Sequence, residues 1–490
     1  MINMISDIKN NLFGRRDIYV SVTEFIDETI LTAVKEAMSQ HDFNRGQISY
    51  LYDYVRGKQP ILDRVKEIRP EIKNTIVENH ALEIKNFKNG FQFGEPVQYI
   101  SRGDEDINDT DNKAEDKGIV GLNQLMFNDD KPAKDVELGD WIFTCGVGYR
   151  ICVQADDPKK VFETYILDPR TTFVVKSSDY RERPVLGITF SDNYDENKKL
   201  KCRRINVYSY DHYWLIEEKS GSYAIKESRN RAYKGIPIFE YRNNSAKMGA
   251  FEPVIGLCDE LNNINSNRMD GIEQFIQALI WFNNCEINSE EYEQLKQHGA
   301  IQTVSGEGKQ ASIKILSEQL DQSQTQITKD DIYQTMLVIA GVPDRQASAG
   351  GNTGQALIIG QGWQMAESHA KAFELQFNNP EKSFLKYVLE ICKNSAAVPK
   401  EVKNLDISNV EVKFTRNRTD NILTKTQALS TMLSSGIHPK TAIATCGLFS
   451  DPQQVWADSA EYLKKYLPEE NGIVKALESI SARQATNGDE

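Results

Sequence analysis

Apolar residues recur at helical spacing along much of this chain, and turn residues separate one run from the next. The pattern from Ile48 to Ile100 predicts two helices followed by a short strand. From Phe251 to Phe282, apolar residues occupy one helical face while Asn and Ser crowd the other. A helix over this second range would be about 50 Å long at 1.5 Å per residue. Periodicity alone favours the core helix of a large domain there.

Between these helical runs the pattern changes to period two, with Tyr, Val, Ile and Thr broken by Asp-Pro and Ser-Gly turns. Such alternation predicts antiparallel strands. A helical run at 137–146 precedes them, so we expect an α+β fold that is predominantly helical. The expected strands lie within 147–153, 162–167, 171–176, 185–190, 205–218 and 222–227.

The second half of the chain returns to helical patterns. Pro343 ends one run, and a glycine-rich loop leads into a very long helical stretch with a break expected near Asn379-Pro380. After a strand at 410–415 come three shorter helical patterns, and the last twenty residues are expected to be partly frayed. The three patterns are 421–433, 439–447 and 453–467.

One stretch, Ser101 to Gly118, is strongly acidic, with seven acidic and three basic residues. Because it contains almost nothing apolar, it is predicted to be a solvated loop or flexible insertion. A cation site is the alternative interpretation, since carboxylate oxygens suit hard cations. Carboxylate-rich loops are common surface linkers, which favours the first interpretation.

The composition describes a large soluble protein. At 490 residues, about three domains are expected, and 40% hydrophobic with 26% charged residues are ordinary values for a folded chain. No apolar run approaches the roughly 20 residues that cross a bilayer, and a secretory signal is not evident, so we expect no membrane contact and synthesis in the cytoplasm. Seven scattered cysteines without a C-x-x-C pair indicate reduced structural thiols.

The net charge of −13 changes the expected relation to nucleic acid. A protein that grips DNA usually carries excess Lys and Arg, which displace counterions from the phosphates. Tight, static DNA binding is therefore disfavoured. A negative surface is still compatible with DNA passing by, because repulsion keeps a polyanion from sticking to a wall.

The search for catalytic chemistry finds one glycine motif worth weighing. Gly350 to Gly354 precedes a helix, as a phosphate cradle does, but Gln355 stands where a P-loop needs lysine. The six histidines lack the spacing of a zinc protease helix, and a serine elbow is missing. We therefore predict that the chain is not an enzyme and that it needs no metal or cofactor.

The order of these pieces resembles the portal proteins of long-tailed double-stranded DNA bacteriophages, over nearly the whole chain. Three strings carry the resemblance: YDYVRGKQPIL with ENHALEIKNFKNGFQFGEPVQY, LDPRTTFVV with PVLGI, and IPIFEYRNNSAKMGAFEPVIGLCDELNNINSNRMDGIEQF. The last is the most specific, since the family places a proline-led strand, an Asn-Asn turn and a long stem helix in this succession.

The resemblance implies a portal fold with wing, stem, clip and crown regions that assembles as a ring of about twelve copies. The implied regions are the wing at 1–250, the first stem helix at 251–284, the clip at 285–326, the second stem helix at 327–343, the tunnel loop at 344–353, a further wing helix and strand at 354–417, the crown at 418–470 and a flexible tail at 471–490.

The resemblance also implies two sets of site residues. The tunnel loop is expected to contact DNA in the channel, and its small, nearly neutral composition suits a loop that tracks moving DNA. The clip is expected to contact the packaging motor or an adaptor. The tunnel-loop residues are Arg345, Gln346, Ala347, Ser348, Ala349, Gly350, Gly351, Asn352 and Thr353, and the clip residues are Glu290, Glu291, Glu293, Lys296, Glu307 and Lys309.

The function that the resemblance implies is a channel at one capsid vertex of the virion, for packaging and ejecting double-stranded DNA. Its implied partners are other copies of the chain, the terminase large subunit, the major capsid and scaffolding proteins and the head-to-tail adaptor. Two alternatives stay open. One is a nucleotide-binding ATPase that uses the loop from Gly350 to Gly354, and the other is a capsid or adaptor protein without a channel.

Overall fold

The computed structural model describes residues 14–67, 69–101, 110–157, 160–194, 200–276, 279–283, 312–316, 322–344, 362–416, 422–449, 455–456 and 458–459. Helices and strands are mixed, which confirms the predicted α+β class. The chain divides into two compact units. Unit 1 comprises Met1–Arg56, Ala81–Pro253 and Val338–Glu490, and unit 2 comprises Gly57–His80 and Val254–Leu337.

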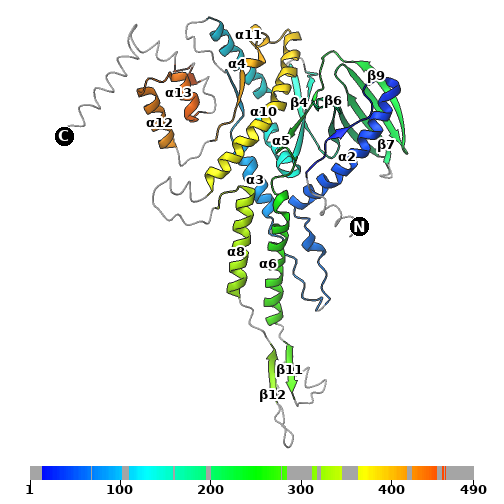
Figure 1. Ribbon diagram of the computed structural model, residues 1–490, viewed down its shortest axis with the longest axis vertical. Helices are drawn as coiled ribbons and strands as arrows, with labels where there is room; N and C mark the ends of the chain where they lie inside the picture. Colours follow the sequence, from blue (N-terminus) through cyan, green and yellow to red (C-terminus); the bar gives the residue numbers. More distant parts are fainter. Residues whose placement is uncertain are drawn as a thin grey trace, which may run out of the picture. The chain divides into compact units, whose positions relative to one another are not determined.

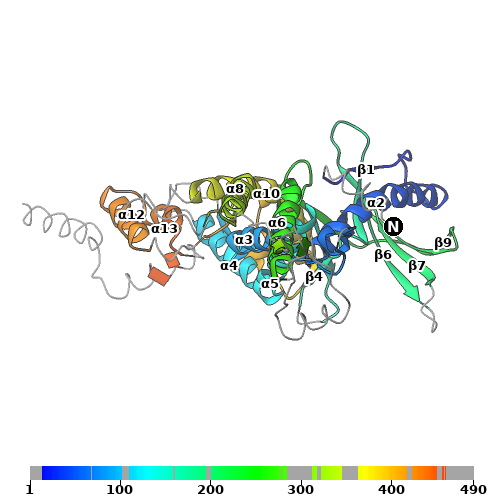
Figure 2. The same cartoon turned by 90° about the horizontal axis from the view of Figure 1, so that it is seen from below.

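A six-stranded sheet in the order β1-β5-β6-β7-β8-β9 forms one layer of unit 1. Helix α2 (Asp27–Val55) lies along one face of it (Figure 1, Figure 2) and buries Ile30, Val34 and Met38 there. The pairs from β5 to β9 are antiparallel, which confirms the period-two prediction. The strands are β1 (Ile18–Tyr19), β5 (Thr172–Lys176), β6 (Pro184–Tyr194), β7 (Leu200–Tyr208), β8 (His212–Lys219) and β9 (Ser222–Asn230).

A second core of unit 1 lies between helices and a three-stranded sheet in the order β10-β3-β4. Two strands from distant parts of the chain, β2 and β13, pair beside it. The predicted helix before β3 is confirmed as α5. The elements are α3 (His80–Phe93), β2 (Gln98–Ser101), α5 (Lys131–Cys145), β3 (Val147–Gln154), β4 (Phe162–Leu167), β10 (Ile238–Arg242), α11 (Lys400–Lys403), η3 (Ile407–Asn409) and β13 (Val410–Lys413).

Helix α10 (Trp363–Asn394) crosses this core without the break expected near Asn379-Pro380. Proline removes one helical hydrogen bond and normally kinks or ends a helix. Here Phe377 and Phe384 are fully buried on either side of Pro380, so tertiary packing holds both halves in line. The predicted break is wrong because the local signal is weaker than this packing.

Unit 2 contains two helices and a strand pair. Instead of one helix from Phe251 to Phe282, a short turn, η2 (Glu252–Val254), precedes α6 (Ile255–Ile276), and β11 (Leu279–Asn283) follows. The run LIWFN reads equally well as helix or strand, and pairing with β12 (Ser312–Leu316) decides for strand. The returning helix, α8 (Gln322–Ala340), begins before the expected start at 327.

Two further boundaries differ from the predictions. Residues 110–118 belong to helix α4 (Thr110–Asn128), so the acidic stretch is in part helical. Residues 57–79, which we call the strap, include the end of one run and the start of another that were expected to be helical. The described residues there form one short turn, η1 (Pro60–Asp63), and otherwise no regular helix or strand.

Two of the three helices expected near the C-terminus are present, as α12 (Ile422–Ser434) and α13 (Pro439–Cys446). Most of the third helix and the tail at 471–490 lie outside the described residues. Six cysteines are free thiols, as predicted, and Cys285 lies outside the described residues. In the described part of the chain, none of the helices has the length and apolar character that crossing a membrane requires.

Candidate functional site

The two helices of unit 2 run antiparallel, as two contacts between them show. Cys258 Sγ lies 3.5 Å from Met336 Sδ, and Arg268 Nη1 donates to Gln326 Oε1 at 2.8 Å. From the first contact to the second, the residue number rises by ten on α6 and falls by ten on α8. Ten residues correspond to about 15 Å of helix, so the two helices match in length between the contacts. Strands β11 and β12 continue the chain beyond the two helices as an antiparallel pair (Figure 1).

The polar face of α6 is dry and holds the strap. Asn262, Ser266 and Asp270 lie one helical turn apart, and each is at most 4% exposed. Their side-chain oxygens accept backbone N–H groups from alternate strap residues, over 2.7 to 2.9 Å. The pairs are Glu78 to Asn262, Ile76 to Ser266 and Asn74 to Asp270.

The spacing of this ladder, Asn262, Ser266 and Asp270, follows from backbone geometry. Four helical residues rise about 6 Å, and two residues of extended chain rise about 6.6 Å. An extended segment can therefore meet every fourth helical residue with every second N–H. The sequence pattern correctly marks a polar face. The half-buried strap covers it, and backbone N–H groups of the strap find their acceptors there.

Charge strengthens the ladder at Asp270. Burial alone would raise the pKa of this carboxyl, but the N–H of Asn74 and the ammonium of Lys66 outweigh it, so the pKa is lowered. Lys66 Nζ lies 3.0 Å and Arg64 Nη2 3.2 Å from Asp270 Oδ2. Both cations belong to the strap, so one buried carboxylate fixes it through backbone and side chains together.

Glu78 connects the strap to the other helix, α8. Its carboxylate lies 3.0 Å from His80 Nε2 and 2.7 Å from Lys329 Nζ. The hydrogen bond with His80, with help from Lys329, lowers the pKa of Glu78 to about 2. Since the Glu78 N–H binds Asn262 on α6, this one residue joins both helices.

The site residues expected from sequence lie outside the described residues, and their roles stay predictions. These are Arg345, Gln346, Ala347, Ser348, Ala349, Gly350, Gly351, Asn352 and Thr353 of the tunnel loop and Glu290, Glu291, Glu293, Lys296, Glu307 and Lys309 of the clip.

Helix α3 contacts the chain before and after residues 345–361, which include the predicted tunnel loop. Lys88 Nζ donates to the carbonyl of Gly341 at 3.0 Å, and the ring of Trp363 packs against Phe87 and Phe91 with centroids 5.9 and 6.0 Å away. Burial lowers the pKa of Lys88 to about 8, and no described carboxylate pairs with it. The chain before and after the loop is thus fixed to one helix.

A second buried cluster, which we call the charge tetrad, was not expected from sequence. Lys131 and Asp135 on α5, Arg150 on β3 and Glu381 on α10 form a closed ring of ion pairs with side chains at most 2% exposed. Lys131 lies 2.6 Å from Asp135 and 3.1 Å from Glu381. Only the i, i+4 spacing of Lys131 and Asp135 is visible in the sequence.

The tetrad is electrostatically balanced at Glu381. Burial would raise the pKa of this carboxyl, but Lys131, Arg150 and the hydroxyls of Tyr241 and Tyr99 lower it to about 2. Each tyrosine hydroxyl donates to it at 2.6 Å. Two cations thus face two carboxylates. Their ion pairs connect α5, β3 and α10 within the second core of unit 1.

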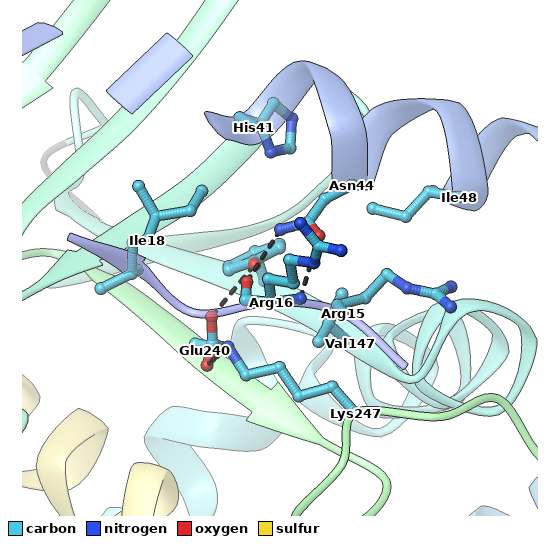
Figure 3. Close-up of a pocket in the computed structure, with 11 residues that line it drawn as sticks. Arg15, Arg16, Ile18, His41, Asn44, Ile48, Val147, Glu240 and Lys247 are labelled. Carbon is cyan, nitrogen blue, oxygen red and sulfur yellow. Dashed lines mark hydrogen bonds and ion pairs between the residues drawn. The ribbon is translucent and has the colours of Figure 1, made fainter. Parts of the chain in front are cut away.

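A small cavity lies between α2 and the N-terminal segment that leads into β1 (Figure 3). Asn44 exchanges two hydrogen bonds, of 2.9 and 2.8 Å, with the backbone of Arg16. His41 also lines the cavity, and burial lowers its pKa to about 4, so its ring is neutral at pH 7. The volume is about 10 Å³, which suits a single water molecule and no substrate.

The tetrad joins elements within unit 1, and the ladder joins elements within unit 2. The class of the protein comes from the family comparison. The chain belongs to the phage portal protein, SPP1 Gp6-like family, whose model matches residues 35–473. No curated protein matches the chain. Portal proteins are structural components of the virion at a capsid vertex, where they form oligomers.

Proposed function

We propose that copies of this chain assemble into a ring around a central channel, through which double-stranded DNA enters the capsid and later leaves it. The family match over residues 35–473 carries this proposal, since it covers both units. The antiparallel helices α6 and α8, locked together through the strap, support it, because a channel wall must keep its shape while DNA moves past.

Within this proposal the regions keep the roles that the family resemblance implies. Helices α6 and α8 are the stem, β11 and β12 belong to the clip, and α12 and α13 belong to the crown. The clip binds the terminase large subunit and later the head-to-tail adaptor, and the ring nucleates assembly of the capsid and scaffolding proteins. ATP hydrolysis then belongs to the terminase. The ring has about twelve copies, by the same resemblance.

Deleting residues 347–353 tests the role of the tunnel loop. The expected result is that rings still form while packaging of DNA by the terminase falls, because the flanking chain is held independently by Lys88 and Trp363. Rings are counted in electron micrographs, and packaged DNA is measured as the nuclease-resistant fraction.

A deletion of equal length at the C-terminus, residues 484–490, is the matched control and should package normally. Loss of rings in the 347–353 deletion, or normal packaging by it, would contradict the proposed role of the loop.

A further inference from the structure

A groove with a volume of about 1960 Å³ crosses unit 1. Residues of α10, of the turn between β5 and β6, of the chain before β10 and of the chain at 403–407 line it. Its floor includes five buried apolar side chains. These are Val174, Ile238, Phe239, Leu389 and Leu405.

The size of the groove indicates the kind of molecule that fits it. Pockets for small molecules measure about 300 to 1,000 Å³. This groove is larger, which suits a segment of polypeptide. An apolar floor also favours protein over DNA, because DNA offers its binding partners mainly phosphate and sugar.

The rim of the groove carries an excess of positive charge. Eight cations and six acids line the groove. The cations are Lys176, Arg181, Arg183, Lys234, Arg242, Lys386, Lys393 and Lys403, and the acids are Glu24, Glu182, Asp211, Glu240, Glu390 and Asp406.

This excess is unusual in a chain with a net charge of −13. The strongest opposite charge lies at residues 104–116, where seven acids accompany a single lysine. A ring of identical copies needs two different complementary surfaces on each copy, so that every subunit meets the next one head to tail. The cationic groove and the acidic stretch are such a pair.

We infer that the groove binds a second copy of this chain through the acidic stretch at 104–116 of that copy. The inference rests on the proposed ring and names one of its contacts. Opposite charges would orient the approach of the two copies, and the apolar floor would exclude water from the contact.

Charge reversal on either side tests the inference. A groove variant carries Lys386→Glu, Lys393→Glu and Lys403→Glu, and a stretch variant carries Asp104→Lys, Glu105→Lys and Asp106→Lys. Each variant alone should form rings only at a protein concentration roughly tenfold or more above that of the unchanged chain, because like charges then face each other. An equimolar mixture should recover ring formation, since each variant complements the other.

The matched control reverses three lysines outside the groove, with Lys371→Glu, Lys382→Glu and Lys400→Glu. It makes the same charge change on exposed positions and should assemble normally. Assembly is measured by analytical ultracentrifugation and by counting rings, and thermal unfolding checks that each variant is folded.

Three results would overturn the inference while leaving the ring proposal intact. Normal assembly of the groove variant is the first. The second is that the mixture of the two variants stays unassembled while a single chain carrying all six changes assembles. That result would place the contact between the groove and the acidic stretch of the same chain. The third is unchanged assembly with weakened binding of a short DNA duplex. If the unchanged chain forms no rings, the proposed function itself falls.

Discussion

The two units of this chain hold their elements together in different ways. In unit 1, the charge tetrad pairs side chains with side chains, and the charges cancel in a site that water does not reach. In unit 2, the ladder on α6 pairs side chains with the backbone of the strap. The comparison teaches that burial of charge makes each tetrad member critical, whereas the ladder distributes its binding over several separate hydrogen bonds.

The largest effect is expected from the tetrad. Glu381→Gln removes one negative charge and leaves Lys131 and Arg150 opposite Asp135 alone. Breaking a buried ion pair on one side costs about 3–5 kcal/mol. The free energy of unfolding, measured in urea, should fall by that amount.

Glu390→Gln, on the exposed side of the same helix, is the control and should unfold like the unchanged chain. A Glu381→Gln protein of unchanged stability would show that the tetrad is not electrostatically essential.

A smaller and local effect is expected in the ladder. Asn262→Ala leaves the half-buried N–H of Glu78 without its acceptor, and the loss of one such hydrogen bond costs about 0.5–1.5 kcal/mol. Amide hydrogen exchange should accelerate most at Glu78 and least at Asn74, because Asp270 still holds the far end of the strap.

Met269→Ala, at an exposed position of α6, should leave the exchange of all strap amides unchanged. Equal acceleration along the whole strap in Asn262→Ala would mean that the ladder acts as one cooperative unit and not as separate bonds.

The last effect is a gain of stability, not a loss. It concerns Lys88, a buried cation with no described carboxylate partner. The pKa of Lys88 is about 8 against an ordinary 10.5, so the folded chain holds this proton less tightly than the unfolded chain. The cost of burying the charge is complete below pH 8 and disappears as the pH rises towards 10.5. Lys88→Met should therefore stabilise the protein at pH 7 by about 1–2 kcal/mol, after loss of the bond to Gly341.

Thermal unfolding at pH 7 and at pH 10 measures this gain, which should shrink at the higher pH. Lys382→Met, on the exposed side of α10, should change the thermal stability by the same amount at pH 7 and at pH 10. A gain for Lys88→Met that does not change with pH would show that packing, and not charge, causes it.

The sequence predicts the regular elements of this fold well where one periodicity dominates. The strands β7 and β8 alternate between buried and more exposed positions, and β3 and β5 are short buried runs rich in residues that favour strands. Helix α5 shows helical spacing, so all of these elements were found. The end of α6 was placed too late, because a short apolar run such as LIWFN has no period of its own. The uninterrupted α10 was missed because only the tertiary packing around Pro380 overcomes the local signal.

The candidate site was harder to predict than the fold. Asn262, Ser266 and Asp270 were seen as a polar face, but their partners are backbone groups of the strap, which no side-chain pattern reveals. Arg150 and Glu381 lie 231 residues apart, so their pairing is set by the fold alone. The Lys131 and Asp135 spacing was a usable signal, although the same spacing is common on exposed helices.

The most direct test of the central claim is an image of the purified, unchanged protein viewed down its symmetry axis by electron cryomicroscopy. The account predicts a closed ring of identical copies around an open central channel. Particles without a central opening, or a chain that remains monomeric at every protein concentration, would contradict it.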